Sequence, residues 1–90
     1  MIITKEILSE AIRLVGTDRQ KDYGDKVENQ NNIAKLWSAY LDVKIEAHDV
    51  AIMMTLLKVA RTKIGAVSKD TYIDMSAYSA IAGEIKWRKK

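Results

Sequence analysis

Two carboxylates four positions apart are the residues of this sequence best placed to do chemistry. On a predicted helix over residues 69–87, Asp70 and Asp74 fall near the middle of an arc that is otherwise apolar. An ionised carboxylate on such a face needs a partner, because leaving it buried and alone costs several kcal/mol. The spacing therefore predicts an inward-facing polar site in which the pair binds either a divalent cation such as Mg²⁺ or a basic side chain.

Two basic side chains are candidate partners for these carboxylates. Lys58 interrupts the apolar run 50–60, and Arg61 follows almost one turn later. In one interpretation, either cation forms an internal salt bridge with the aspartates, and Asp70 also complements the helix dipole. In the other, the two cations bind an anion, since a guanidinium matches the geometry of phosphate. The residues alone leave both interpretations open.

The segment 16–25 adds residue types that are common in phosphate sites. Its glycines and charges break the apolar period and predict a loop that could carry function. Arg19 and Lys21 would join the two cations named above on the phosphates of a nucleotide, and the ring of Tyr23 suits its base. Asn29, at the start of the next helix, would contact the base or ribose. Together these residues predict a nucleotide pocket.

Four helices are needed to position these groups. Apolar residues recur at three- and four-residue intervals and predict helices over 4–15, 26–41, 47–64 and 69–87. The third is apolar nearly all round, so it is expected to be central and buried. The pattern predicts an all-α fold, a four-helix, bundle-like single domain over residues 1–90.

The helix 26–41 has one apolar face and one polar face. Asn29 and Gln30 fall near the edges of the apolar face and are expected to point inward, whereas Glu28 and Lys35 point away. The apolar face is formed by Ile33, Leu36, Trp37, Tyr40 and Leu41. His48, at the start of the third helix, is expected to be solvated or to cap that helix.

Composition narrows the class of protein. A chain of 90 residues with 48% hydrophobic residues, 30% charged residues and no proline is typical of a folded helical protein, and its small size predicts a homo-oligomer. The absence of cysteine excludes disulfides and thiolate sites and fits the cytoplasm of a cell. No apolar run approaches the roughly 18 residues of a membrane span.

The charge pattern argues against nucleic acid as a partner. The net charge of +3 includes a tail of Lys86, Arg88, Lys89 and Lys90, which is expected to fray into solvent. No basic stripe continues this tail along the chain. The expected partners are therefore a small-molecule nucleotide and further copies of the same chain.

Several stretches together resemble a family of small phage-associated proteins. They are Lys21-Asp-Tyr-Gly-Asp25, Glu28-Asn29, Ile33-Ala-Lys-Leu-Trp37, Asp49-Val-Ala, Leu57-Lys-Val-Ala-Arg61 and the residues from Asp70 to Tyr78. The pattern is also similar to the MazG-like, all-α nucleoside triphosphate pyrophosphohydrolases and to phage nucleotide-modification-associated domains. The resemblance covers roughly residues 16–85.

The MazG-like resemblance implies an oligomeric bundle in which acidic residues hold Mg²⁺ and a nucleoside triphosphate is cleaved between its α and β phosphates. Its hallmark is one helix with E-x-x-E and another with E-x-x-D. Asp70 and Asp74 approximate the second half and would hold the metal. The first half is missing, because Glu28 is followed at that spacing by Asn31.

These observations lead to three expectations of function. The first is a phage-type nucleotide-binding protein that sequesters a small signalling nucleotide of the host, an anti-defence role. The second is a Mg²⁺-dependent pyrophosphohydrolase in which Glu28 or Asp49 of a neighbouring subunit completes the metal site. The third is a structural or protein-interaction module with salt-bridged aspartates and an exposed apolar surface.

Overall fold

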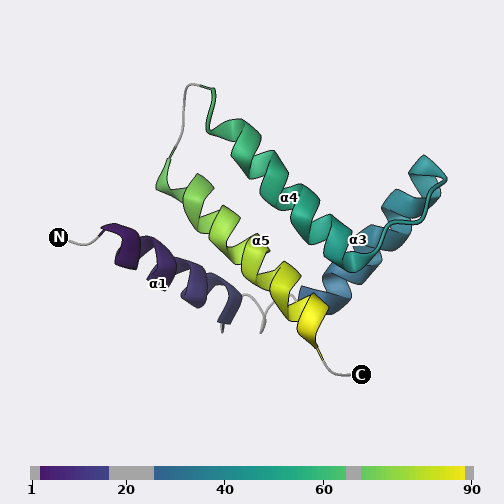
Figure 1. Ribbon diagram of the computed structural model, residues 1–90, viewed down its shortest axis with the longest axis horizontal. Helices are drawn as coiled ribbons and strands as arrows, with labels where there is room; N and C mark the ends of the chain where they lie inside the picture. Colours follow the sequence, from purple (N-terminus) through teal and green to yellow (C-terminus); the bar gives the residue numbers. More distant parts are fainter. Residues whose placement is uncertain (1–2, 17–25, 65–67, 89–90) are drawn as a thin grey trace.

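The protein is all-helical in the part of the chain that the structure, a computed structural model, describes: residues 3–16, 26–64 and 68–88. Within these ranges there are four helices and no strand: α1 (Ile3–Gly16), α3 (Lys26–Leu41), α4 (Ala47–Arg61) and α5 (Lys69–Trp87) (Figure 1). The predicted all-α class is therefore confirmed.

The end of α4 differs from the range 47–64 expected from the apolar period. After Arg61 the backbone continues in i to i+3 turns, in which Thr62 N–H donates to Val59 O at 3.0 Å and Lys63 N–H to Ala60 O at 3.2 Å. Such tightened turns are common where a helix ends, because they satisfy carbonyls that have no partner within the helix. Apolar spacing does not distinguish them from a further α-helical turn.

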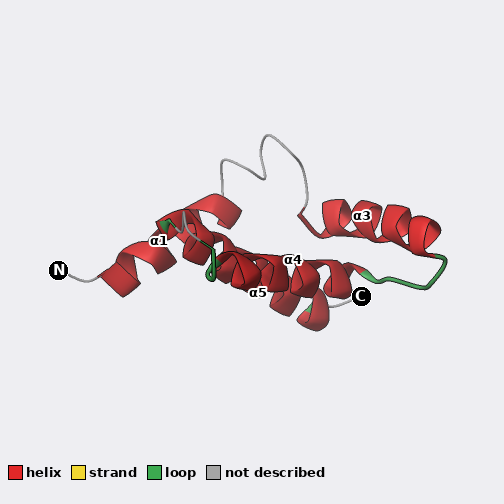
Figure 2. Ribbon diagram, turned by 90° about the horizontal axis from the view of Figure 1, so that it is seen from above, coloured by secondary structure: helices red, strands yellow, loops and turns green. Residues whose placement is uncertain are grey.

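The helices form an open arrangement rather than a closed bundle. α4 and α5 run antiparallel and side by side, α1 packs on α5, and α3 packs mainly on α4 (Figure 1). Seen from above, α1 and α3 lie toward opposite ends of the molecule (Figure 2). The radius of gyration is 14.0 Å, whereas a compact chain of this length has about 12 Å.

The core is built almost entirely from small side chains. Six alanines and one valine are its buried apolar residues among those described: Ala11, Ala34, Ala47, Val50, Ala51, Ala77 and Ala82. Small residues let helices approach closely, but they bury little apolar area each. Since hydrophobic stabilisation scales with that area, one copy of the chain gains little of it.

The expectation that α4 is buried on all sides is wrong. Its buried residues are Ala47, Val50 and Ala51, while Leu56 is 58% exposed. On α3, Leu36 and Tyr40 from the predicted apolar face are 70% and 88% exposed. The physical reason is coverage: α5 and α3 contact only one side of α4, and the last turns of α3 extend beyond it (Figure 1).

Candidate functional site

Asp74 is paired with a lysine across the central helices. Lys58 Nζ on α4 lies 3.0 Å from Asp74 Oδ2 on α5, and the two side chains are 15% and 31% exposed. One of the two interpretations of the aspartates, an internal salt bridge, is thereby confirmed for this residue. The contact compensates a carboxylate that is more than half buried between helices.

Asp70 does not share this position, and the expectation that it faces inward is wrong. Its side chain is exposed even though Asp70 and buried Ala77, seven residues apart, lie on the same side of α5. Asp70 is in the first turn of the helix, where Ser68 and Lys69 are exposed as well. In the three described ranges, no group of three His, Asp or Glu side chains is close enough to hold a metal ion. The described residues therefore do not form the expected Mg²⁺ site around this pair.

The other residues of the predicted nucleotide pocket are dispersed or outside the described ranges. Arg61 is exposed, and so is Asn29, although the apolar period placed it at an inward edge. The buried positions at this end of α3 are Gln30 and Ala34 instead. Arg19, Lys21 and Tyr23 lie outside the residues that the structure describes.

A pocket of about 1050 Å³ lies at a different place, where α3, the α3–α4 connection, the start of α4 and the end of α5 meet. One face of α3 forms a wall through Val27, Asn31, Ala34, Lys35 and Ser38. These residues are spaced by three, four and one, so they line a single side of the helix. Ile85 and Lys86 of α5 contribute to the same pocket.

Positive charge dominates the lining of this pocket, which we call the basic pocket. Its four cations come from three segments: Lys35 on α3, Lys44 in the connection, and Lys86 and Arg88 at the end of α5. Glu46 and Asp49 are its two carboxylates. Exposed ion pairs contribute little energy, so these carboxylates only partly compensate the cations. The pocket is thus suited to an anion.

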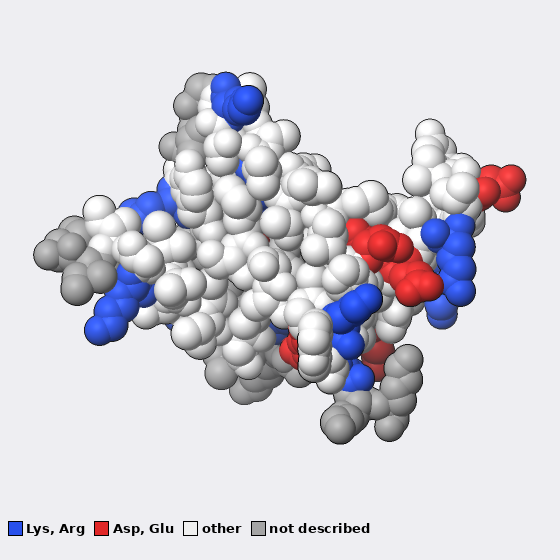
Figure 3. All heavy atoms as spheres, viewed as in Figure 1, with Lys and Arg blue, Asp and Glu red and all other residues white. Residues whose placement is uncertain are grey.

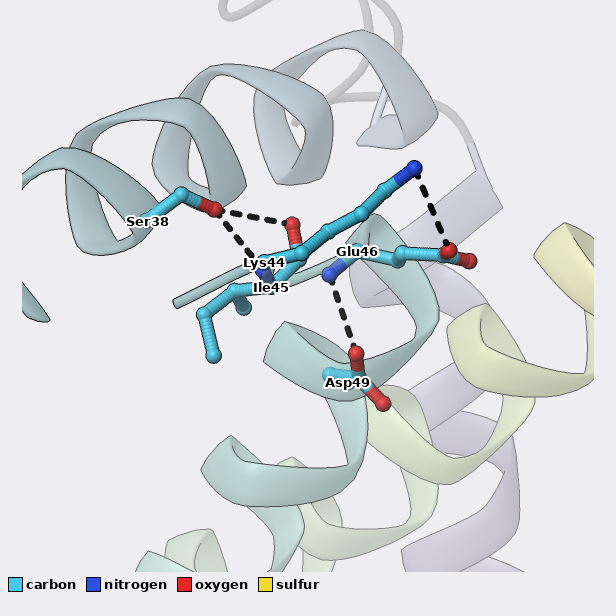
Figure 4. A network of polar contacts seen from close by, with 5 residues as sticks. All are labelled: Ser38, Lys44, Ile45, Glu46 and Asp49. Carbon is cyan, nitrogen blue, oxygen red and sulfur yellow. Dashed lines mark hydrogen bonds and ion pairs between the residues drawn. The ribbon is translucent and has the colours of Figure 1, made fainter. Parts of the chain in front are cut away.

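Both carboxylates of the pocket already have partners in the chain. Asp49 Oδ2 accepts a hydrogen bond of 2.9 Å from the backbone N–H of Glu46, and Glu46 Oε2 lies 3.9 Å from Lys44 Nζ (Figure 4). Arg88 forms an ion pair with Glu84 on its own helix. Because these contacts involve exposed side chains, an anion of higher charge can compete with them.

The start of α4 adds a dipole to the pocket. Ala47, His48 and Asp49 are the first three residues of this helix and all line the pocket. The positive end of the helix dipole favours an anion at such a position. The backbone N–H of Asp49 already donates to the Glu46 side chain in a capping box, so an anion here would depend on the dipole and on the first two residues of the helix. His48, which was expected to be solvated or capping, is half-buried here and offers a ring N–H as a further donor.

The connection between α3 and α4 is held in place by one serine. Ser38 Oγ donates to Ile45 O at 3.1 Å and accepts from Ile45 N–H at 2.8 Å (Figure 4). Asp42 follows α3 with φ of 57°, the left-handed conformation that turns the chain back at a helix end. Together these two residues bring Lys44 and Glu46 alongside α3.

The sequence profile of the family described as "Domain of unknown function (DUF6378)" matches residues 6–86, which include every residue lining the basic pocket except Arg88. The chain belongs to this DUF6378 family. The match begins in α1 and extends almost to the end of α5.

Two proteins called "Gene 55 protein" are similar to this DUF6378 chain. The protein of Mycobacterium phage D29 is 40% identical over 83 residues, which are 92% of this chain and 55% of that relative. The protein of Mycobacterium phage L5 is 41% identical over 76 residues, 83% of this chain and 49% of that relative. The chain therefore spans about half the length of the curated relatives it matches. The expected resemblance to phage proteins is confirmed.

No solved structure matches this DUF6378 chain. Among the described helices, none combines the length and apolar character required to cross a membrane.

The basic pocket of this DUF6378 chain was not anticipated from the residues. Lys86 was expected to fray with the tail, but it lies in the last turn of α5, which ends at Trp87 as the apolar period predicted, and it lines the pocket. Lys35 was correctly expected to point away from the apolar face. The available signal was the spacing of Val27, Asn31, Lys35 and Ser38 along one side of α3, opposite its apolar face.

Proposed function

We propose that this DUF6378 chain binds a nucleotide in the basic pocket. The observation that supports this proposal is the convergence of four cations from three segments on one pocket of about 1050 Å³. That volume is slightly above the range typical of small-molecule sites, about 300 to 1000 Å³. A ligand with several phosphates could contact more of these cations at once than a singly charged ligand.

The lining has side chains suited to the phosphates of a nucleotide and others suited to its base. Lys35, Lys86 and the guanidinium of Arg88 suit the phosphates, and a guanidinium can donate two parallel hydrogen bonds to one phosphate. Val27 and Ile85 are apolar surfaces against which a base can lie. This combination of a few charges with apolar walls is characteristic of sites for small organic ligands rather than for free phosphate.

We propose binding without hydrolysis, and sequestration of a signalling nucleotide of the host as its outcome. The resemblance to MazG-like enzymes expected from the sequence would imply Mg²⁺-dependent hydrolysis as the alternative. The described residues do not fit that metal, since Asp74 is paired with Lys58 and Asp70 is exposed. Hydrolysis would need acids such as Glu28 or Asp49 from a neighbouring subunit, so we derive no hydrolytic step.

The binding proposal is tested by calorimetry with ATP, ADP-ribose, cyclic di-AMP and tripolyphosphate. At least one nucleotide is expected to bind, and Lys35→Ala combined with Lys86→Ala should weaken its affinity about tenfold to a hundredfold, because charged hydrogen bonds are lost. The matched control is Lys5→Ala with Arg61→Ala, which removes the same charge from exposed residues outside the pocket.

Three results would contradict the proposal. Absence of heat with all four compounds would exclude a nucleotide of these classes. Loss of affinity in the control pair alone would place the ligand near Arg61 rather than in the basic pocket. Release of pyrophosphate from a nucleoside triphosphate, abolished by EDTA and by Asp74→Asn, would show an enzyme.

A further inference from the structure

α4 has an apolar stripe on the side turned away from its own core. Ile52, Leu56 and Val59 follow one another at intervals of four and three residues and are 39%, 58% and 45% exposed. The buried residues Ala47, Val50 and Ala51 lie on the other side of the helix. A stripe at this spacing is the pattern by which one helix packs along another.

The stripe lies on a molecule that exposes more surface than its mass requires. The chain exposes 6882 Å², whereas a folded monomer of this mass exposes about 5300 Å². The difference exceeds the about 800 Å² that each partner buries in an interface of standard size. Together with the alanine-rich core, this leaves room for a partner to cover the apolar residues of the stripe.

The stripe is flanked by opposite charges at its two ends. Asp49 precedes Leu56 by seven residues and Lys63 follows it by seven, and both are exposed. Between them, Lys58 is turned inward to Asp74, which leaves the outward side of α4 uncharged. Figure 3 shows one face on which the middle of α4 and α5 carries few charged side chains, while charge gathers toward the periphery.

This charge pattern favours one partner in one orientation. If two copies of α4 pack antiparallel across a twofold axis at Leu56, Asp49 of each copy comes opposite Lys63 of the other, twice by symmetry. A parallel arrangement would instead place like charges together. Antiparallel packing also brings opposite ends of the helix dipoles together.

We propose that α4 is the interface of an antiparallel homodimer, with Leu56 at the twofold axis. The interface requires no ligand, although its end residue Asp49 also lines the basic pocket. The curated relatives are about twice as long as this chain, and the remainder of such a chain is the other partner that could cover the stripe. A monomeric chain of 90 residues would favour that partner and overturn the proposal.

The first experiment measures mass in solution by light scattering coupled to gel filtration. The chain is expected at twice its 10.2 kDa. Leu56→Glu would place two carboxylates at the axis and should yield the monomer with unchanged helical circular dichroism. Ile12→Glu is the matched control, because Ile12 is 68% exposed on α1 and should leave the dimer intact. The proposal would be overturned if both variants were monomeric or if both remained dimeric.

The second experiment tests orientation and uses the absence of cysteine from the chain. Leu56→Cys should form a covalent dimer on mild oxidation with copper phenanthroline, because the two copies meet at this residue. Lys63→Cys should not, since the two positions would be about 20 Å apart along an antiparallel pair, far beyond the about 6 Å of a disulfide. Cross-linking of both variants would show parallel packing and overturn the assigned geometry.

Discussion

Lys58 and Asp74 join the two central helices through an ion pair, with Nζ and Oδ2 3.0 Å apart. The contact explains why a carboxylate is tolerated on the inner side of α5, next to buried Ala77. It also turns a lysine away from the outer side of α4. The same ion pair thus compensates the part-buried carboxylate of Asp74 and keeps the charge of Lys58 away from the outer side of α4.

Removing one partner of this pair is expected to destabilise the fold. Lys58→Met should lower the free energy of unfolding by about 1 to 2 kcal/mol, because Asp74 is left part-buried without a counter-charge. Replacing both residues, Lys58→Met with Asp74→Leu, should cost less than the sum of the single changes. Urea denaturation of the unchanged chain, of Lys58→Met, of Asp74→Leu and of the double variant measures this coupling. Strict additivity would mean that the contact contributes nothing.

An exposed pair provides the control for that experiment. Glu6 and Lys69 form an ion pair of 2.8 Å between α1 and α5, with both side chains at least half exposed. Glu6→Gln is expected to change the free energy of unfolding by less than about 1 kcal/mol, since solvent screens such pairs.

Ser38→Ala is expected to loosen the α3–α4 connection. The part-buried N–H and C=O of Ile45 both lose their partner, which should cost about 1 to 2 kcal/mol. Hydrogen exchange should show faster exchange at Ile45 N–H. Ser76→Ala is the matched control, because Ser76 Oγ makes one exposed bond to Tyr72 O within its own helix. A larger effect in the control would mean that the serine does not hold the connection.

Asp42→Gly is expected to stabilise the protein. Asp42 has φ of 57°, a conformation that glycine adopts without the steric cost of a Cβ atom, so the free energy of unfolding should rise by about 0.5 to 1 kcal/mol. Asp42→Val should lower it, because a β-branched side chain is strained there. Thermal denaturation compares the two variants. A less stable Asp42→Gly than Asp42→Val would contradict the left-handed backbone at this residue.

Gln30→Leu is also expected to stabilise the protein. Gln30 is 4% exposed, and no donor in the described ranges reaches its Oε1. An unpaired buried polar atom is costly, so an apolar side chain of similar size should add about 1 kcal/mol to the free energy of unfolding. Asn29→Leu, at an exposed neighbour, should change stability little. A destabilised Gln30→Leu protein would show that the amide has a partner.

The salt dependence of nucleotide binding tests the electrostatic origin of the basic pocket. Raising the salt from 0.05 to 0.5 M should weaken ATP binding about tenfold or more, since screening shortens the reach of exposed charges. Adenosine, which lacks phosphates, serves as the control and should be affected little. Equal sensitivity of both compounds would argue against phosphate recognition by Lys35 and Lys86.

The sequence predicted those features that depend on neighbours along the chain. Apolar spacing located the four helices, because helical periodicity is local. The pairing of Lys58 with Asp74 was one of two interpretations. The burial of α4 could not be predicted, since a pattern shows which side chains favour burial but not whether the same chain covers them. The basic pocket depends on Lys86 lying near Lys35, 51 residues earlier.

The basic pocket takes its walls from the middle and from the end of the chain. α3 has most of its contacts with α4 and far fewer with α5. A ligand that contacts Lys35 on one side and Lys86 on the other would therefore hold α3 against α5. By thermodynamic linkage, the free energy that the ligand gains from both sides is the free energy with which it resists their separation. Ligand binding and the contact between α3 and α5 would then stabilise each other.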